Sequence, residues 1–274
     1  MAVDYKELKK GGFMRQRQKD HFSMRLKSVG GHFTAAQLGT VQKVAEQYGK
    51  GYVHLTSRQG IEIPFIRLED IDAVKKTLHE GGVSVGVCGP RVRTITACQG
   101  CAVCASGLID TQHLANEFDK RYGGRELPHK FKFGFTGCHN NCLKAEENDF
   151  GVKGGVKPQW SADNCTFCGV CEAVCPEKAI TVKADEGKVV LDESKCVYCG
   201  KCIKSCPTDA WQGRLRHLVR RPLRQPHRDR PPFPANRLRG REALRSRRHD
   251  AGLLREVREA ERALCQLPRP RWLG

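Results

Sequence analysis

Apolar and polar residues alternate in short regular blocks through the first 85 residues of the chain. His21 to Ser28 alternates with a period of two, which predicts a strand. Thr34 begins a helix that runs to about Tyr48 and carries its apolar residues on one side, namely Ala36, Leu38, Val41, Val44 and Ala45. Tyr52 to Ile66 predicts one or two further strands, and Glu69 to Glu80 predicts a helix ended by Gly81 and Gly82. Residues 13–85 are therefore expected to form a unit of alternating strands and helices.

A second block of elements follows between residues 86 and 160. We expect a strand near Val92 to Ala97, a helix from about Thr111 to Arg121 and a strand at Lys130 to Phe135. The last strand alternates strictly, which places Lys130, Lys132 and Gly134 on one face and Phe131, Phe133 and Phe135 on the other. The aromatic face is suited to a core, and the lysine face is suited to solvent or to an anion. The whole pattern predicts an α+β fold whose first unit is of ferredoxin-like type.

Two cysteine runs of identical spacing occupy residues 161–212. One run contains Cys165, Cys168, Cys171 and Cys175 before Pro176, and the other contains Cys196, Cys199, Cys202 and Cys206 before Pro207. This spacing is typical of bacterial ferredoxins with two 4Fe-4S clusters, in which the fourth cysteine of each run ligates the other cluster. A zinc ribbon is the alternative, but zinc takes its four ligands in two pairs, which leaves the repeated triplets unexplained. We therefore predict a two-cluster ferredoxin domain at residues 161–212.

A third set of four cysteines lies in the middle of the chain, in the pattern Cys98-x5-Cys104 and, after a long gap, Cys138-x3-Cys142. Four thiolates at this spacing are suited to a further 4Fe-4S cluster. Cys101 lies between the first two and imitates a ferredoxin triplet, but no Cys-Pro follows it. We therefore interpret Cys101 as a spare thiol, and Cys88 as a small buried side chain.

Five stretches in a fixed order carry a resemblance to a known family. They are His21 to Gly31 with its double glycine, Leu55-Thr56-Ser57-Arg58-Gln59, Arg91-Val92-Arg93, the two cysteine pairs of the third set, and Leu127-Pro128-His129-Lys130-Phe131-Lys132. Together they resemble the siroheme-dependent sulfite and nitrite reductases, above all the sulfite reductases with a ferredoxin insert, such as the catalytic subunit of anaerobic sulfite reductase and the dissimilatory enzymes. The resemblance covers residues 13 to about 212. It implies a ferredoxin-like half-domain on the substrate side at residues 13–85 and a siroheme and 4Fe-4S domain at residues 86–160.

The resemblance also implies a set of site residues. In that family the four cysteines hold a 4Fe-4S cluster and the last thiolate, here Cys142, also binds the siroheme iron. Matched motifs place Arg93, Lys130 and Lys132 on the bound anion, with Arg25 or Lys27 as a further contact and Arg58 near the carboxylates of the macrocycle. Fixed positive charge suits such a pocket because siroheme and its substrate are both anionic. Each of these side chains taken alone is equally compatible with a solvated surface charge.

The implied cofactors are three 4Fe-4S clusters and siroheme, and the implied reaction is the reduction of sulfite to sulfide. Reduction of nitrite to ammonium is the alternative, because the same charges serve either anion. A second alternative is an electron-transfer subunit that lacks siroheme. We expect an electron-donor protein as a partner. Larger members of the family build the site across two similar halves, and this chain has one half, so we also expect self-association or a second subunit.

The positive charge is concentrated at the C-terminal end. The net charge is +18, and residues 214–274 contain 18 arginines, no lysine and 6 acidic residues. We predict an Arg/Pro-rich tail at residues 213–274 that is disordered or irregular. Codons for Leu215 to Pro232 can be chosen so that the neighbouring frame encodes a glycine-rich segment resembling the one that follows the insert in the family. Our hypothesis is that the reading frame changes near Gly213.

Two alternatives give this tail a function. A basic tail could bind nucleic acid through phosphates, but Phe233 and Trp272 are its only aromatic residues for stacking on bases. The apolar residues Leu253, Val257, Ala260 and Leu264 have helical spacing and could dock on a partner. We regard nucleic-acid binding as the weaker interpretation.

Thiol chemistry and the N-terminal sequence indicate the compartment. Cluster cysteines must stay reduced, which favours the cytoplasm. Met1 to Asp20 is polar and lacks the apolar core of a signal peptide, and no stretch is apolar enough to span a membrane. We therefore expect a cytoplasmic protein that does not enter a membrane.

Overall fold

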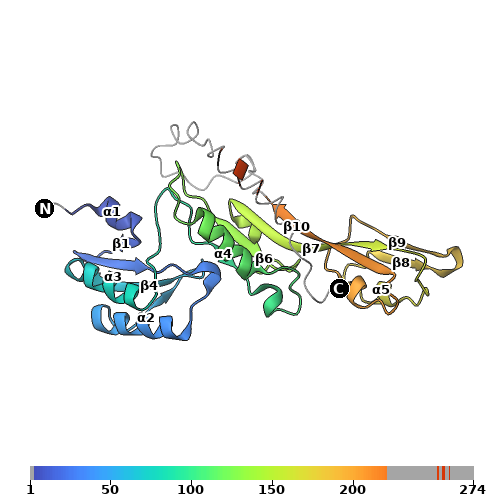
Figure 1. Ribbon diagram of the computed structural model, residues 1–274, viewed down its shortest axis with the longest axis horizontal. Coiled ribbons are helices and arrows are strands. Elements are labelled where there is room, and N and C mark those ends of the chain that lie inside the picture. The colour runs from blue at the N-terminus through green and yellow to red at the C-terminus, as the bar shows by residue number, and fades with distance from the viewer. Residues whose placement is uncertain (1–2, 221–251, 253–254, 257–258, 260–274) are drawn as a thin grey trace, which may run out of the picture.

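The computed structural model describes residues 3–220 together with Gly252, Arg255, Glu256 and Glu259. Three parts follow one another along its longest dimension, namely an N-terminal half-domain, a central part and a ferredoxin part (Figure 1). Two long strands, β7 (Phe150–Trp160) and β10 (Trp211–Arg220), run from the central part into the ferredoxin part and connect them. Within these described residues, no helix has the length and apolar composition needed to cross a membrane.

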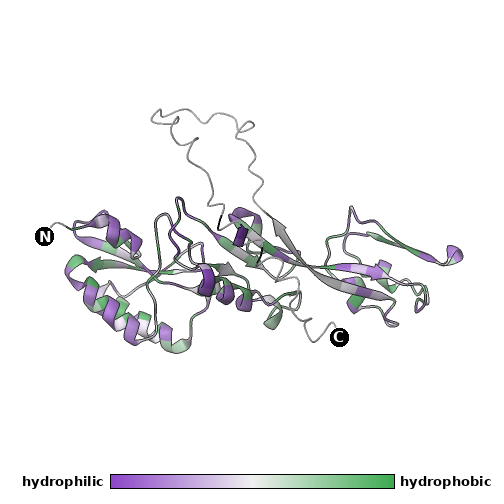
Figure 2. Cartoon of the chain, turned by 45° about the horizontal axis from the view of Figure 1, so that its top comes forward, coloured by the Kyte–Doolittle hydropathy of each residue, from purple (hydrophilic) through white to green (hydrophobic). Residues whose placement is uncertain are grey.

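The half-domain is an antiparallel sheet packed against two helices, and the predicted alternation of strands and helices is confirmed. The strand order is β1-β2-β4-β3. The strands are β1 (Phe13–Arg15), β2 (His21–Arg25), β3 (His54–Leu55) and β4 (Ile61–Arg67), and the helices are α1 (Tyr5–Lys10), α2 (Ala35–Tyr48) and α3 (Ile71–Glu80). Figure 2 shows hydrophilic and hydrophobic residues along both α2 and α3, as expected of helices that cover a sheet with one face.

Local chemistry explains where helix α2 begins and which side it buries. Thr34 Oγ1 accepts a hydrogen bond from Gln37 N at 3.2 Å, and Gln37 Oε1 accepts one from Thr34 N at 2.9 Å, so the two residues form a capping box. The buried residues of α2 are Val41, Val44 and Ala45. Leu38 and Ala36, which the sequence pattern places on the buried side, are exposed, and Leu38 is 46% exposed.

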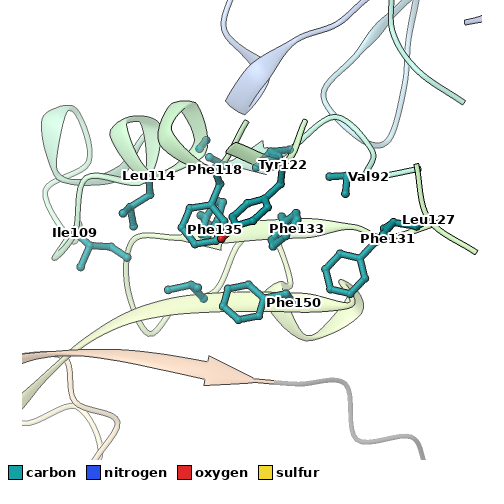
Figure 3. Packing of buried hydrophobic residues seen from close by; sticks show 14 residues of the cluster. Val92, Ile109, Leu114, Phe118, Tyr122, Leu127, Phe131, Phe133, Phe135 and Phe150 are labelled. Atoms are coloured by element: carbon teal, nitrogen blue, oxygen red, sulfur yellow. The ribbon is translucent and has the colours of Figure 1, made fainter. Parts of the chain in front are cut away.

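The central part is built on a sheet of strand order β10-β7-β6-β5. Strands β5 (Thr96–Ala97), β6 (Phe133–Thr136) and β7 are parallel neighbours, and β10 pairs antiparallel with β7. Helix α4 (Thr111–Tyr122) is capped by Asp110, whose side chain accepts from the His113 amide at 2.9 Å. The ring of Phe118 packs against those of Phe133 and Phe135, with centroids 5.4 and 5.1 Å apart (Figure 3).

The alternation predicted for Lys130 to Phe135 is present. Phe131, Phe133 and Phe135 are each at most 4% exposed and belong to the core of the central part. Lys130 is exposed and Lys132 is half-buried. The regular strand is shorter than predicted, because β6 begins at Phe133 and Phe131 makes only an isolated bridge to Val92.

Strand β7 is the longest of the elements that the sequence analysis did not predict, which also include α1, β1 and β10. Its sequence contains Gly151, Gly154, Gly155 and Pro158, residues that disfavour a strand assignment. The structure explains one of these glycines, because a Cβ atom at Gly154 would lie 2.3 Å from the carbonyl oxygen of Gly137. Residue 154 therefore has no side chain so that β7 can approach the turn that carries Cys138.

The ferredoxin part repeats one small motif twice. Strands β8 (Ile180–Lys183) and β9 (Lys188–Leu191) form a hairpin. A short helix precedes the hairpin along the chain, α5 (Val170–Ala173), and another follows it, α6 (Lys201–Lys204). Each helix follows a glycine with positive φ, Gly169 at 76° and Gly200 at 72°, which allows the cysteine loop to curl. Short 3₁₀ turns elsewhere in the chain lie at Val29–Gly31, Leu68–Asp70, Gly100–Ala102, Ala145–Glu147 and Ala184–Glu186.

The predicted boundary of the tail at residue 213 falls inside a regular strand. Strand β10 continues to Arg220 and pairs with β7 in unbroken register from Trp211 opposite Trp160 to Arg220 opposite Gly151. Farther along, Glu256 forms an ion pair of 2.9 Å with Arg125, just after helix α4. The remaining predictions for the tail, including the helical spacing from Leu253 to Leu264 and the change of reading frame, lie mostly outside the described residues.

We predict that Gly154→Ala destabilises the protein. The added methyl group must displace the backbone of Gly137, and overpacking of this kind typically costs about 1–3 kcal/mol. Gly39→Ala is the matched control, because Gly39 lies inside helix α2 and its Cβ would meet no atom within 4 Å. That variant should gain roughly 0.5–1 kcal/mol from helix propensity. Denaturant unfolding of the three proteins tests this, and equal stability of Gly154→Ala and wild type would contradict it.

Candidate functional site

The cysteines of the two ferredoxin runs line two small cavities. The outer cavity is lined by Cys165, Cys168, Cys171 and Cys206. The inner cavity is lined by Cys175, Cys196, Cys199 and Cys202. Each cavity thus receives three cysteines from one run and the last cysteine of the other run, which is the exchange that the spacing predicts for two 4Fe-4S clusters.

The chemistry of these cavities fits a group that binds thiolates. The Ala179 amide donates a hydrogen bond to Cys175 Sγ at 3.2 Å. Burial raises the pKa of Cys202 to about 12, so this thiol requires a bound metal to become a thiolate at neutral pH. In the part of the chain that the structure describes, no three His, Cys, Asp or Glu side chains converge on a single ion position. The thiols surround a space instead of meeting at a point.

The third cysteine set is positioned by two parallel strands. Cys98 directly follows β5, and Cys138 comes shortly after β6. Because β5 and β6 are parallel neighbours, their carboxyl ends meet at the same end of the sheet and bring the two cysteines together. The Gly137 amide donates to Cys98 Sγ at 3.0 Å. Burial raises the pKa of Cys138, and the charges of Cys104, Cys142 and Cys98 raise it further, so the four thiols lie close together.

The turn that presents Cys142 is shaped by Asn141. Its backbone has a positive φ of 52°. Asn141 Oδ1 accepts hydrogen bonds from Thr136 Oγ1 at 3.2 Å and from the Ala145 amide at 2.9 Å. Asparagine tolerates this conformation better than most residues do, and here its side chain also ties the end of β6 to the following 3₁₀ turn. Cys142 consequently lies exposed beside the buried Cys138.

The inner cavity is the one that adjoins the third cysteine set. Leu108, Cys138, Val156 and Ile203 form one apolar cluster between them. The Val156 amide donates to the Tyr198 carbonyl at 2.9 Å, which fastens the loop of the inner cavity to β7. The inner cavity therefore separates the outer cavity from the third set along the molecule.

A cationic cavity opens between the half-domain and the central part. Its volume is about 210 Å³. Five basic side chains line it, and all five were predicted as site residues from the sequence, namely Arg25, Arg58, Arg93, Lys130 and Lys132. They come from β2, from the loop before β4 and from the segments before β5 and β6. The fold therefore collects positive charge from distant parts of the chain at one place.

Two arginines of the cationic cavity are held by the protein itself. Arg58 donates to Asn148 Oδ1 at 2.8 Å and to the Thr94 carbonyl at 3.0 Å. Arg93 Nη1 donates to the Val87 carbonyl at 2.8 Å. The buried Nε of Arg93 has no hydrogen-bond partner among the described residues. A buried guanidinium donor without a partner suits a site that receives an anion.

Burial and repulsion between basic side chains lower the pKa values of two residues in the cationic cavity. Burial lowers the pKa of Lys132, and the positive charges of Arg58 and Lys130 lower it further. Burial also lowers the pKa of Arg58, with a second contribution from the charge of Arg93. The cavity thus holds cations closer together than they would lie in water, and an anion placed among them would relieve the repulsion.

Arg25 and Lys27, the two alternatives for a further anion contact, have different surroundings. Arg25 lines the cationic cavity, forms an ion pair with Glu62 and donates to Cys88 Sγ at 3.5 Å. Lys27 Nζ lies 2.5 Å from Asp119 Oδ2 and is directed towards helix α4. The structure therefore brings Arg25, and not Lys27, to the other basic residues.

Two polar residues support the site without having been singled out from the sequence. Gln59 Nε2 donates to the Ala97 carbonyl at 2.8 Å and Gln59 Oε1 accepts from the Ala97 amide at 3.0 Å, directly before Cys98. Asn148 orients Arg58. Gln59 lies inside one of the five stretches that carry the resemblance, which was a usable signal. Nothing in the sequence marks Asn148, because its partner is distant along the chain.

Family models match most of the described chain. Residues 14–81 match the nitrite/sulfite reductase ferredoxin-like half domain, and residues 88–193 match the nitrite and sulphite reductase 4Fe-4S domain. Residues 189–212 match a 4Fe-4S binding domain. The second match extends beyond residue 160, where the sequence analysis places the start of the ferredoxin insert.

Curated relatives include two sulfite reductases. One subunit of the anaerobic sulfite reductase of Salmonella typhimurium is 38% identical over 198 residues, which is 67% of this chain and 58% of that protein. Coenzyme F420-dependent sulfite reductase of Methanocaldococcus jannaschii is 32% identical over 175 residues, which is 64% of this chain and 28% of that protein. This chain therefore aligns with little more than half, or less, of the length of these relatives.

A solved structure supports the fold. The crystal structure of dissimilatory sulfite reductase I superposes with a TM-score of 0.53 at 22% sequence identity, over 71% of this chain and 53% of that chain. At this level of identity the likeness concerns the arrangement of the elements alone.

We predict that two cysteine substitutions affect the same cluster when both residues line the same cavity, even if the residues belong to different cysteine runs. Cys175→Ala combined with Cys196→Ala should lose no more iron than either change alone, because both residues line the inner cavity. Cys175→Ala combined with Cys168→Ala should lose the iron of two clusters, because these residues line different cavities. Iron and sulfide analysis of the purified variants checks this. Greater loss in the first pair than in the second would contradict it.

Lys132→Met should stabilise the anion-free protein. The folded-state pKa of Lys132 lies below its unfolded value, so the protonated lysine destabilises the folded state at neutral pH. The difference between variant and wild type should shrink as the pH rises towards the ordinary pKa of lysine. We expect a gain of less than about 1 kcal/mol, because the cavity is open to solvent.

Thermal unfolding at several pH values measures the effect of Lys132→Met. Lys43→Met is the control, since Lys43 is exposed on helix α2, away from the cationic cavity. Added sulfite should stabilise wild type more than Lys132→Met. A variant that is less stable than wild type at neutral pH and equally responsive to sulfite would disprove the repulsion.

Proposed function

Because the chain belongs to the nitrite and sulfite reductase family, with its ferredoxin-like half domain at residues 14–81 and its 4Fe-4S domain at residues 88–193, we propose that it is an oxidoreductase that reduces sulfite to sulfide. The observation that carries the proposal is the convergence of Arg25, Arg58, Arg93, Lys130 and Lys132 on one cavity of a domain that also holds a four-cysteine set. The two similar proteins named as sulfite reductases support this substrate.

The cofactors proposed for the reaction are siroheme and three 4Fe-4S clusters. Bound clusters supply one-electron transfer, and siroheme supplies an iron centre at which an oxyanion is reduced. The set Cys98, Cys104, Cys138 and Cys142 would hold one cluster, and Cys142 would also bind the siroheme iron. Its exposure beside a buried Cys138 supports that second role. The outer and inner cavities would hold the two remaining clusters.

The basic residues would bind and orient the anion. Arg93 presents a buried Nε without a partner among the described residues, and Lys130 and Lys132 reach the same cavity from one side of their strand. Arg58 is fixed by hydrogen bonds to Asn148 and to the Thr94 carbonyl. Its side chain therefore loses little conformational entropy when an anionic group binds. We assign Arg58 to the carboxylates of the macrocycle and Arg25, not Lys27, to the further contact with the substrate.

Lys132 is suited to deliver protons as well as charge. Reduction of sulfite consumes protons, and a lysine whose pKa is lowered gives up its proton more readily than an ordinary lysine does. The lowering comes from burial first and then from Arg58 and Lys130. Binding of an anion would reverse part of the shift and keep Lys132 protonated until the charge of the anion changes.

The proposal includes partners and a compartment. We infer an electron-donor protein or subunit, which agrees with the naming of the Salmonella relative as one subunit of an enzyme. We also infer a second copy or a second subunit, because larger members of the family build the site across two similar halves and this chain has one such half. Reduced thiols favour the cytoplasm.

Nitrite is the second candidate substrate. The matched family models cover nitrite and sulfite reductases alike, and the positive charge of the cavity serves either anion. Turnover of both anions with a chemically reduced donor separates the two candidates.

We predict that Cys142→Ala abolishes sulfite reduction and removes the visible absorption bands that exceed the broad iron–sulfur absorption. The reason is that the variant lacks the thiolate that joins cluster and siroheme. Cys101→Ala is the matched control, because Cys101 lies between two of the four cysteines yet is interpreted as a spare thiol. The control should keep its spectrum and its rate. Absorption spectra and steady-state assays of the purified proteins measure both effects.

Different outcomes of this experiment identify different errors. If Cys142→Ala keeps both its colour and its rate, the assigned role of Cys142 is wrong. If wild type shows iron–sulfur absorption alone and reduces neither anion, the chain is an electron-transfer subunit without siroheme. If Cys101→Ala loses iron, the ligand set of the third cluster is wrong.

A further inference from the structure

Two tryptophans face each other where strands β7 and β10 meet. Trp160 and Trp211 are direct partners in the antiparallel register. Both indole Nε1 atoms are buried, and neither has a hydrogen-bond partner among the residues described. A buried N–H donor that is left without a partner destabilises the folded protein, so such a donor calls for an acceptor. A cluster bound in the outer cavity would offer sulfur acceptors to the indole of Trp211 and not to that of Trp160.

The surroundings of the two indoles differ. Trp211 is 3% exposed and lines the outer cavity together with Cys165, Cys168, Cys171 and Cys206. Trp160 is not among the residues that line either cysteine cavity, and its ring packs against Phe167 with centroids 6.4 Å apart. The same chemical group therefore belongs to the wall of the outer cavity in one case and packs against an aromatic neighbour outside both cavities in the other.

We propose that Trp211 Nε1–H donates a hydrogen bond to a sulfur of the outer cluster and raises the reduction potential of that cluster. Reduction adds negative charge to the cluster, and a donor fixed against its sulfur stabilises the reduced form more than the oxidised form. This inference rests on the proposed presence of a 4Fe-4S cluster in the outer cavity. Trp211 is a positioning residue of the electron path, and it makes the outer cluster a better acceptor for electrons from the donor protein.

The test is a redox titration of the purified, cluster-loaded full chain, monitored by electron paramagnetic resonance. Trp211→Phe keeps the aromatic ring and removes the N–H. Its outer-cluster midpoint should move to a more negative potential, while the inner-cluster midpoint stays where it is. Trp160→Phe makes the same chemical change directly opposite and should move neither midpoint. Cys168→Ala, which removes a ligand of the outer cavity, identifies the outer-cluster signal.

A second measurement needs no substitution in the cavity. In wild-type protein labelled with ¹⁵N in the tryptophan indole, pulsed resonance on the outer cluster should detect coupling to one indole nitrogen, and its N–H proton should exchange in D₂O. This measurement decides the question even if Trp211→Phe fails to assemble its cluster. Trp160→Phe should retain the coupling.

The results that overturn the inference are specific. Unchanged midpoints in Trp211→Phe, equal shifts in Trp211→Phe and Trp160→Phe, or no indole coupling in wild type would each refute the hydrogen bond. If wild-type protein shows no ferredoxin-cluster signal at all, the cluster assignment of the proposed function is wrong, and the inference falls with it.

Discussion

The structure depends on the packing of four apolar residues where the ferredoxin part meets the central sheet. Leu108, Cys138, Val156 and Ile203 bring together a loop of the third cysteine set, the turn after β6, the middle of β7 and helix α6. Each belongs to a different segment, so their contact fixes the positions of the inner cavity and the third cysteine set at once. Burial of apolar surface there thus sets the spacing between the inner cavity and the third cysteine set.

The cationic cavity follows a different principle. Its five basic residues repel one another, and the fold holds them together with fixed acceptors such as Asn148 and the Thr94 carbonyl. An anion that enters the cavity would relieve the repulsion among the basic residues, and a preorganised site gains affinity in this way. The aromatic core behind β6 supplies the rigidity, because Phe131, Phe133 and Phe135 anchor the strand whose other side carries Lys130 and Lys132.

Much of this arrangement could be predicted from the sequence wherever the signal is local. The cysteine spacing of the ferredoxin runs, the capping of α2 by Thr34 and the alternation after Lys130 all depend on neighbours within a few residues. Strand β7 could not be predicted, because Gly154 is required by the approach of Gly137 and the pairing partner of the strand, β10, lies far along the chain. Likewise, only the folded chain shows that Lys27 is paired with Asp119 while Arg25 lines the cavity.

The position of strand β10 beside β7 has one more consequence. It occupies the outside position of the central sheet and pairs with β7 from Trp160 to Gly151. A shorter chain that stopped after the last cysteine run would leave the amide and carbonyl groups of β7 unpaired along that border. Unprotected borders of this kind recruit strands from other molecules and lead to domain-swapped or aggregated protein. The segment after the cysteines therefore supplies the partners that the amide and carbonyl groups of β7 need, and β10 itself becomes the edge strand of the sheet.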